Sequence, residues 1–224
     1  MNLHFSTFSD RAEAAQALAA RLMNYSGRNP LVLAIPRGAV PMGNIIAHRL
    51  GGELDIVLVR KLGAPFNPEY ALGAVDETGW VHLNRSAGEE GEANAFIAKE
   101  KTRQLELMKE RRARYTPSRP PIDPAGRIVI VVDDGLATGA TMIAALHAVR
   151  AKKPAELVCA VPVAAPESLA TVRQFADKTV CLHTPDNFYA VGQFYRHFSQ
   201  VEDEEVIRIL DAAGGSARGH PETN

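Results

Sequence analysis

Residues 129–141 read VIVVDDGLATGAT, a hydrophobic run followed by two carboxylates and a loop of small residues. The β-branched residues at 129–132 are typical of a strand that is buried on both faces of a parallel sheet. The chain then turns at Gly135, so Asp133 and Asp134 directly follow the strand. Because open α/β sheets bind ligands beyond the carboxyl ends of their strands, we expect both carboxylates to border a ligand site.

The loop from Ala137 to Thr141 is suited to an anion such as phosphate. We expect a helix to begin near Ala140, and the first turn of a helix offers free backbone N–H groups and the positive end of the helix dipole. The acid pair can only accept hydrogen bonds, which suits ribose hydroxyls or the waters of a bound Mg²⁺. The alternative is that the pair and Gly135 form a plain turn and that Thr138 caps the helix.

The segment resembles the signature of the type I phosphoribosyltransferases, in which a hydrophobic strand is followed by two acidic residues and a loop ending in Thr-Gly-x-Thr. The matching residues are Asp133, Asp134, Thr138, Gly139 and Thr141. The resemblance is strongest to a bacterial branch that has the form Asp-Asp-Gly-x-Ala-Thr-Gly-Ala-Thr. It implies binding of 5-phosphoribosyl-1-pyrophosphate (PRPP), with the 5′-phosphate on residues Ala137, Thr138, Gly139, Ala140 and Thr141 and the ribose diol on the acid pair.

The composition is that of a globular protein with room for one large α/β domain. The chain has 224 residues, of which 46% are hydrophobic and 23% charged, and its net charge is −1. Neither a membrane segment nor a signal peptide is predicted, so we expect a cytosolic protein. The charge gives no reason to expect nucleic acid as a partner. Cys159 and Cys181 lie in apolar runs and are interpreted as reduced core thiols, with a disulfide or redox role as the alternative.

The order of the predicted elements favours an open, mostly parallel twisted sheet with helices on both faces. Strands are predicted at residues 31–35, 54–59, 129–132, 156–161 and 179–182, and a hairpin at 70–75 and 80–83. Helices are predicted at 10–24, from the glycine-bearing loop at 37–43 through Leu50, and at 92–114 and 167–175. We expect a single domain over residues 1–213. It would comprise a core at 10–182, a small C-terminal hood at 183–200 and a helix at 202–213, followed by a disordered tail at 214–224.

Arg37 and Gly38 follow the first predicted strand and form a second candidate site. Glycine allows a close backbone approach or a strained conformation, and arginine offers a planar charged fork for phosphate oxygens. An ordinary strand-to-helix turn is the alternative. In the type I family the loop at this position binds pyrophosphate, so the resemblance implies that role here.

Arg60 and Lys61 follow the strand predicted to end at Val59. Cations aimed at a diphosphate leaving group contribute most in the transition state, where negative charge develops. The pair resembles the start of the family's flexible loop, but residues 63–69 replace the further basic residue of several members. Whether this loop closes over the site is left open, and a solvated pair at a strand end is the alternative.

Phe188 and Tyr189 lie in the predicted hood and are candidates for contact with a flat base. The segment is similar to the hood of the hypoxanthine-guanine members, but Tyr195 and Arg196 stand where those members have an acidic residue. The lysine that reads a purine oxo group is also missing, so purine specificity does not carry over. The alternative is that these aromatic side chains seal the core.

Residues 109–114 form a basic cluster at the end of the longest predicted helix. Cations near the C-terminus of a helix are stabilised by its dipole, which is the favoured interpretation. Binding of RNA or of an anionic effector is the alternative. The seven histidines show no metal-ligand spacing.

The resemblance implies an enzyme that transfers a 5-phosphoribosyl group from PRPP to a nitrogen nucleophile and releases pyrophosphate, with Mg²⁺ as cofactor. We expect the nucleophile to be a nucleobase or a related small molecule. Asp133, Asp134, Arg37 and Lys61 are the expected catalytic residues, and Gly38 and Arg60 are expected to bind substrate. No side chain is expected to bind the metal directly, since Mg²⁺ would be held through PRPP and waters near the acid pair. The acceptor and a homodimer are left open, and a regulatory sensor of PRPP or nucleotide, or a hydrolase of phosphoribosyl compounds, is the alternative.

Overall fold

A five-stranded sheet lies at the centre of the computed structural model, which describes residues 7–64, 67–83, 91–117 and 119–216. Its strand order is β2-β1-β6-β7-β8, and all neighbouring strands pair in parallel. The strands are β1 (Leu31–Ala34), β2 (Glu53–Ile56), β6 (Ile128–Val132), β7 (Glu156–Val163) and β8 (Lys178–His183). The parallel α/β fold that the sequence predicts is confirmed.

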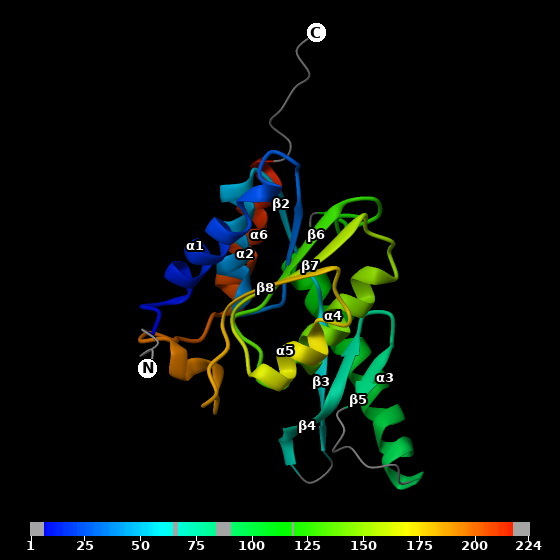
Figure 1. Ribbon diagram of the computed structural model, residues 1–224. Helices are drawn as coiled ribbons and strands as arrows, with labels where there is room; N and C mark the ends of the chain where they lie inside the picture. The colour runs from blue at the N-terminus through cyan, green and yellow to red at the C-terminus, as the bar shows by residue number, and fades with distance from the viewer. Residues whose placement is uncertain (1–6, 65–66, 84–90, 118, 217–224) are drawn as a thin grey trace.

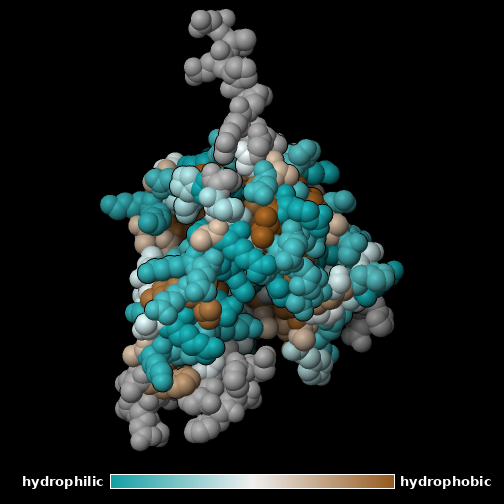
Figure 2. All heavy atoms as spheres, turned by 180° about the vertical axis from the view of Figure 1, so that it is seen from behind, coloured by the Kyte–Doolittle hydropathy of each residue, from teal (hydrophilic) through white to brown (hydrophobic). Residues whose placement is uncertain are grey.

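Alternating side chains of each strand reach two separate hydrophobic layers. In β6, Ile130 and Val132 pack on the side of α1 (Arg11–Arg21), α2 (Ala39–Leu50) and α6 (Asp203–Ser216), whereas Val129 and Val131 face α4 (Ala140–Arg150) and α5 (Pro166–Val172). Figure 1 shows these two helical layers on either side of the sheet. The side chains of residues 129–132 are fully buried, and burial of each is worth about 1.5–3 kcal/mol. Seen from behind, hydrophilic residues cover most of the surface (Figure 2).

A second, antiparallel sheet of three strands lies beside the main one (Figure 1). It consists of β3 (Val59–Ala64), β4 (Asn67–Asp76) and β5 (Val81–Leu83), and α3 (Gly91–Tyr115) packs against it. The predicted hairpin is confirmed as β4 and β5. The expectation that Arg60 and Lys61 follow a strand is wrong. Both residues lie within β3, where they pair with Val75 and Ala74 of β4.

Small residues let this second sheet approach the start of α4 closely. Ala74 of β4 packs against Ala140 and Ala144 of α4. At the other end of α4, His147 Nδ1 lies 2.9 Å from Oδ2 of the buried Asp76, and the Trp80 ring stacks on the His147 ring with centroids 3.8 Å apart. These contacts fix β3 and β4 beside the loop that precedes α4.

The ends of several elements differ from the predicted ones. The first helix ends at Arg21 and is followed by a 3-10 turn, η1 (Met23–Tyr25), and α6 continues to Ser216. The described part of the chain does not include residues 217–224 of the predicted tail, residues 65–66 of the loop after Lys61, or residues 1–6. Cys159 and Cys181 are both free. None of the helices in the described residues is both long and apolar enough to span a membrane.

Candidate functional site

A cavity of about 260 Å³ opens at the carboxyl ends of β1 and β6. The structure brings most of the predicted site residues together around it. The cavity is lined by Gly38, Lys61, Asp133, Asp134, Ala137, Thr138, Gly139 and Thr141. We call it the donor pocket, after the role that the sequence predicts for these residues. Ala140 is the first residue of α4 and is buried behind the lining. Residues from segments distant in the sequence therefore meet at one edge of the sheet.

The loop that enters α4 presents a helix start to the donor pocket. Gly139 has φ +76°, a left-handed conformation that glycine adopts without strain, and it precedes the first residue of the helix. Apart from a long contact of 3.5 Å from the Ala140 N–H to Thr138 Oγ1, no side chain among the described residues caps this end. Ser168 Oγ donates to the Ala137 carbonyl at 2.6 Å and holds the loop. The backbone N–H groups of the first turn are thus available to an anion.

Arg11 forms an ion pair with one member of the acid pair. Its Nε and Nη2 donate to Asp134 Oδ2 at 3.0 and 2.8 Å, and its Nη1 donates to the Ser199 carbonyl at 2.7 Å. The guanidinium also lies 3.8 Å above the Phe198 ring. Only 13% of the Arg11 side chain and 17% of the Asp134 side chain are exposed, so this charged contact is shielded from water.

The sequence does not point to Arg11 as a site residue. It is the first residue of α1, and 123 positions separate it from Asp134. It follows the helix cap Asp10, whose carboxylate accepts from the Glu13 N–H at 2.9 Å. In the sequence, Arg11 is therefore an ordinary charged residue in the first turn of a helix. Only the packing of α1 beside α2 and against β7 and β8 brings it to the acid pair.

The two carboxylates lie in different electrostatic environments. Burial, and then the charge of Asp134, raise the pKa of Asp133 well above its usual range. Burial also raises the pKa of Asp134, but the charge and hydrogen bonds of Arg11 oppose this shift. Asp133 Oδ1 accepts only the Asp134 N–H, at 2.9 Å, among the hydrogen bonds of the described residues. Asp133 therefore carries the less compensated negative charge in the pocket.

Gly38 is required for space. Its φ of −56° and ψ of −34° are ordinary helical values that any residue adopts. A Cβ atom at this position would, however, lie 2.3 Å from Asp134 Oδ2 and 3.1 Å from Arg11 Nη2. The close approach that the sequence predicts for this glycine therefore occurs toward the acid pair, and it allows the loop after β1 to pack beside the end of β6.

Arg37 lies at the border of the donor pocket. The peptide bond that joins Pro36 to it is cis. Its side chain lines an adjoining cavity of about 480 Å³ together with Arg11 and Asp134. Arg37 Nη1 is 3.5 Å from carboxylate oxygens of both Glu202 and Asp203, and 29% of the side chain is exposed. These long ion pairs leave the guanidinium accessible to a further anion.

Lys61 and Arg60 lie on opposite faces of β3. Lys61 lines the donor pocket. Arg60 lines a different cavity, and its Nε donates to Gln104 Oε1 of α3 at 2.7 Å. Successive side chains of a strand point to opposite faces, so the expectation that both cations reach the same ligand is corrected for Arg60.

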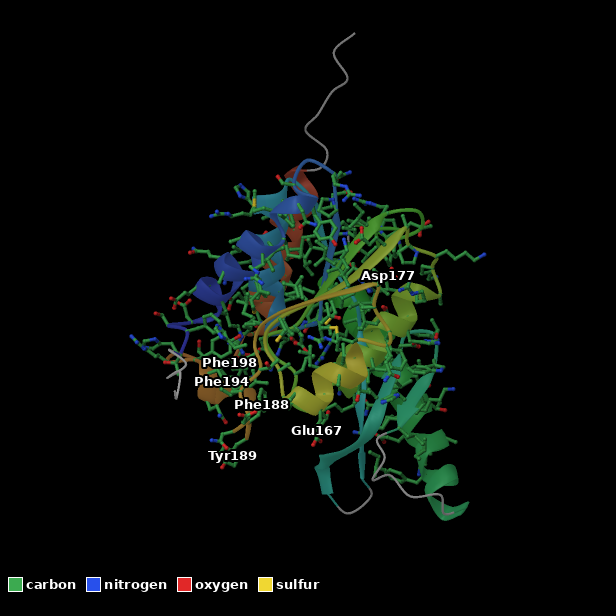
Figure 3. All side chains as sticks on the ribbon, in the orientation of Figure 1. Glu167, Asp177, Phe188, Tyr189, Phe194 and Phe198 are labelled. Carbon is green, nitrogen blue, oxygen red and sulfur yellow. The ribbon has the colours of Figure 1, made fainter. Side chains whose placement is uncertain are left out.

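The hood residues differ in what they contact. The Phe188 ring packs against Phe194 with centroids 5.0 Å apart and adjoins the hydrophobic core, whereas Tyr189 is 87% exposed. Figure 3 shows Phe188 and Phe194 close together and Tyr189 at the outer end of the segment. Neither Phe188 nor Tyr189 lines the donor pocket, but Val191 of the 3-10 turn η3 (Val191–Phe194) does. Tyr195 OH donates to the Asp134 carbonyl at 2.6 Å and ties the hood to the acid pair.

The two hood aromatic residues are expected to respond differently to truncation. Tyr189→Ala should weaken binding of a nucleotide product by about 1–3 kcal/mol if its ring stacks on a base, and should leave the unfolding free energy unchanged. Phe188→Ala should lower the unfolding free energy by about 3 kcal/mol or less because the ring is only partly buried. Titration with nucleotide and denaturant unfolding of both variants test this difference. Unchanged nucleotide affinity in Tyr189→Ala would place the acceptor away from Tyr189.

A helix start that can bind an anion and an acid pair meet at the carboxyl edge of a parallel sheet. This arrangement is typical of the α/β proteins that bind phosphorylated sugars and nucleotides. Residues 8–199 match the family model of the phosphoribosyl transferase domain, and the chain belongs to this family.

Known proteins with similar sequences or structures agree with this assignment. Two Mycobacterium tuberculosis proteins, each named "Putative phosphoribosyl transferase", are 44% identical to the chain over 208 residues. The match covers 92% of this chain and 47% of each relative, so the chain spans about half the length of these curated relatives. The protein TT1426 from Thermus thermophilus, whose crystal structure is known, is 45% identical in sequence to this chain. The two structures superpose with a TM-score of 0.77, and the match covers 91% of this chain and 97% of TT1426. The fold is therefore shared with an experimentally determined structure.

Proposed function

We propose that this protein transfers a 5-phosphoribosyl group from PRPP to a nitrogen nucleophile and releases pyrophosphate. The observation that carries the proposal is the meeting of three features in one pocket: the start of α4, the acid pair and Lys61. The helix start suits the 5′-phosphate, the carboxylates suit the ribose hydroxyls, and the cation suits the diphosphate. The adjoining cavity at Arg37 extends the cationic side of the site.

The chemistry asks for positioning and charge stabilisation more than for a covalent nucleophile. As the bond between the anomeric carbon and the diphosphate oxygen breaks, its electron pair stays with the diphosphate. Positive charge then develops on the ribose and negative charge on the leaving group. Asp133 and Asp134 would stabilise the positive charge on the ribose. Lys61 and Arg37 would stabilise the negative charge on the leaving group. The helix start of α4 would fix the far end of the donor and so orient the anomeric carbon. The lone pair of the acceptor nitrogen would form the new bond to this carbon, and the proton on that nitrogen would pass to water or to the released diphosphate.

A divalent cation fits the residues of the pocket. Mg²⁺ prefers oxygen ligands and usually keeps several of its waters while it binds phosphate groups. Asp133 has a raised pKa because burial and Asp134 disfavour its negative charge, and a nearby cation would relieve that penalty. We propose that Asp133 and Asp134 would hold an Mg²⁺ ion through its waters. Its chemical contribution would be to offset negative charge on the leaving group.

We propose a nucleobase or a related small nitrogen compound as the acceptor. Val191 offers an apolar edge on the hood side of the donor pocket, and the exposed Tyr189 ring, two residues before it and outside the pocket lining, offers a flat face. Incubation with PRPP, Mg²⁺ and a panel of nucleobases, followed by detection of pyrophosphate and of the nucleotide product, tests the proposal. A nucleotide formed from one base would identify the acceptor.

Thr141→Val should weaken PRPP binding without loss of fold. Thr141 is the second residue of α4 and lines the donor pocket, so its hydroxyl is suited to the 5′-phosphate. Loss of one hydrogen bond to a charged group costs about 1.5–3 kcal/mol, which is roughly a 10- to 150-fold rise in the dissociation constant. Titration with PRPP and Mg²⁺ measures this rise. Thr171→Val removes an exposed helical hydroxyl of α5, outside the pocket lining, and serves as the matched control; equal affinity in both variants would refute the placement of the phosphate.

A further inference from the structure

A second cavity of about 210 Å³ lies where α3, β3 and the start of α6 meet. Three arginines, two carboxylates and one leucine line it, namely Arg60, Arg111, Arg114, Glu110, Asp203 and Leu107. We call this cavity the arginine pocket. It lies on the face of β3 opposite to Lys61 and shares none of its lining residues with the donor pocket.

The negative charge of Asp203 is already compensated. Its Oδ2 accepts from Arg114 Nη1 at 2.8 Å, and its Oδ1 accepts from the Tyr115 hydroxyl at 2.5 Å. Hydrogen bonds from Tyr115 and the charges of the nearby arginines lower the pKa of Asp203, although burial opposes this shift. Arg114 and Asp203 therefore form a neutral pair at the edge of the pocket.

Arg60 and Arg111 carry the remaining positive charge. Within the described part of the chain neither of them forms an ion pair, since Arg60 contacts the neutral Gln104 and Arg111 lies 5.8 Å from the Tyr115 ring. Glu110 is the one carboxylate of the lining that Arg114 and Tyr115 do not engage, and it is exposed. Burial, and then the charges of Arg111 and Arg103, lower the pKa of Arg60. Two half-buried guanidinium groups thus face one exposed carboxylate.

We propose that the arginine pocket binds a small phosphoryl anion, a function separate from the PRPP site. Guanidinium groups match phosphate oxygens in two-point contacts, and an anion between Arg60 and Arg111 would relieve their mutual repulsion. The volume of the pocket suits inorganic phosphate or the end of a diphosphate. The basic cluster at the end of α3 therefore contributes Arg111 and Arg114 to an anion site, in addition to stabilising the helix dipole.

Binding of inorganic phosphate at physiological ionic strength tests the proposal by calorimetric titration. Arg111→Gln should weaken binding at this site about ten-fold or more, since one hydrogen bond between charged partners is lost. Glu110→Gln removes the exposed carboxylate and should tighten binding. These two variants remove opposite charges from adjacent positions, so a general effect on folding cannot produce both results. Arg150→Gln, which removes an arginine paired with Asp177 outside the pocket lining, should bind phosphate as the parent does.

A second titration, with a nucleoside diphosphate, distinguishes the source of the phosphoryl group. Tighter binding that depends on Arg111 would identify a nucleotide, and equal or weaker binding with the same dependence would identify free phosphate. PRPP affinity measured on the same variants reports on the donor pocket, so failure of the proposed enzyme function would not be confused with failure of this site. Phosphate isotherms of Arg111→Gln and Glu110→Gln that both match the parent would overturn the proposal.

Discussion

Asp133→Asn is expected to reduce kcat/KM for pyrophosphate release by roughly 30- to 150-fold, which corresponds to about 2–3 kcal/mol of transition-state stabilisation. Asp133 lines the donor pocket and carries the less compensated charge of the acid pair. The amide keeps the shape of the side chain but cannot offset positive charge on the ribose or hold the waters of a cation. Steady-state kinetics with saturating Mg²⁺ measure the effect.

The same variant is expected to be more stable than the parent at neutral pH. Because the pKa of Asp133 is raised in the folded state, the folded protein holds this proton more tightly than the unfolded chain does. The stabilising contribution of the protonated Asp133 carboxyl group is therefore present below the pKa of about 3.9 in the unfolded chain. This contribution is lost as the pH rises through the pKa of Asp133 in the folded protein. Replacement by a neutral amide should raise the unfolding free energy at pH 7 by about 0.5–2 kcal/mol. Denaturant unfolding across this pH range should show the difference shrinking toward acid pH.

Asp134→Asn is the control for this prediction. It removes the charged partner of Arg11, whose side chain is only 13% exposed. Because Arg11 opposes the rise in the pKa of Asp134, the gain in unfolding free energy at neutral pH should be smaller than in Asp133→Asn. The two neighbouring variants are thus expected to differ in the size of their stability change while both reduce turnover. An Asp133→Asn protein that folds, turns over as fast as the parent and is no more stable would remove Asp133 from the site.

Gly38→Ala is expected to weaken PRPP binding by on the order of 100-fold, the result of losing about 1.5–3 kcal/mol of charged hydrogen bonding. The added Cβ would meet Asp134 Oδ2 at 2.3 Å and Arg11 Nη2 at 3.1 Å. Either the carboxylate or the loop after β1 must move, and both belong to the site. The backbone dihedral angles of Gly38 already suit alanine, so the effect arises from crowding alone.

Gly51→Ala supplies the matched control. Gly51 ends α2 with φ +64°, and a Cβ there meets no atom within 4 Å. The substitution should lower the unfolding free energy by about 1 kcal/mol through backbone strain and leave PRPP affinity unchanged. Titration with PRPP and circular dichroism of both variants separate the two effects. Equal PRPP affinity in Gly38→Ala and the parent would show that contact between the two loops is not required for binding.

The sequence predicts elements whose side chains repeat with a clear period. The β-branched residues 129–132 of β6 indicate a buried strand by themselves, and the residues after it indicate a ligand site because parallel strands end at a common edge. The structure brings Lys61 and the loop before α4 together in the donor pocket. Local pattern and global fold agree at these positions.

Other features depend on contacts between distant segments and are not visible in the sequence. Arg11 reaches Asp134 only because α1 packs across the sheet. In the sequence, Arg60 and Lys61 resemble the start of a loop that follows a strand. In the structure they lie within β3 and pair with β4, so their side chains point to opposite faces and Arg60 is directed away from the donor pocket. Phe188 and Tyr189 are adjacent aromatic residues, yet only the structure distinguishes the one that packs on Phe194 from the one that is exposed.

Pyrophosphate release from PRPP, measured with and without each member of a panel of nucleobases, tests the central claim most directly. The proposed transferase should release pyrophosphate in an Mg²⁺-dependent manner, faster with one base than without any, and form one nucleotide per pyrophosphate. Asp133→Asn should lose most of this activity. Release that is equally fast without any base would indicate hydrolysis of PRPP. PRPP binding by the parent without any release would contradict the assignment of the donor pocket as a catalytic site.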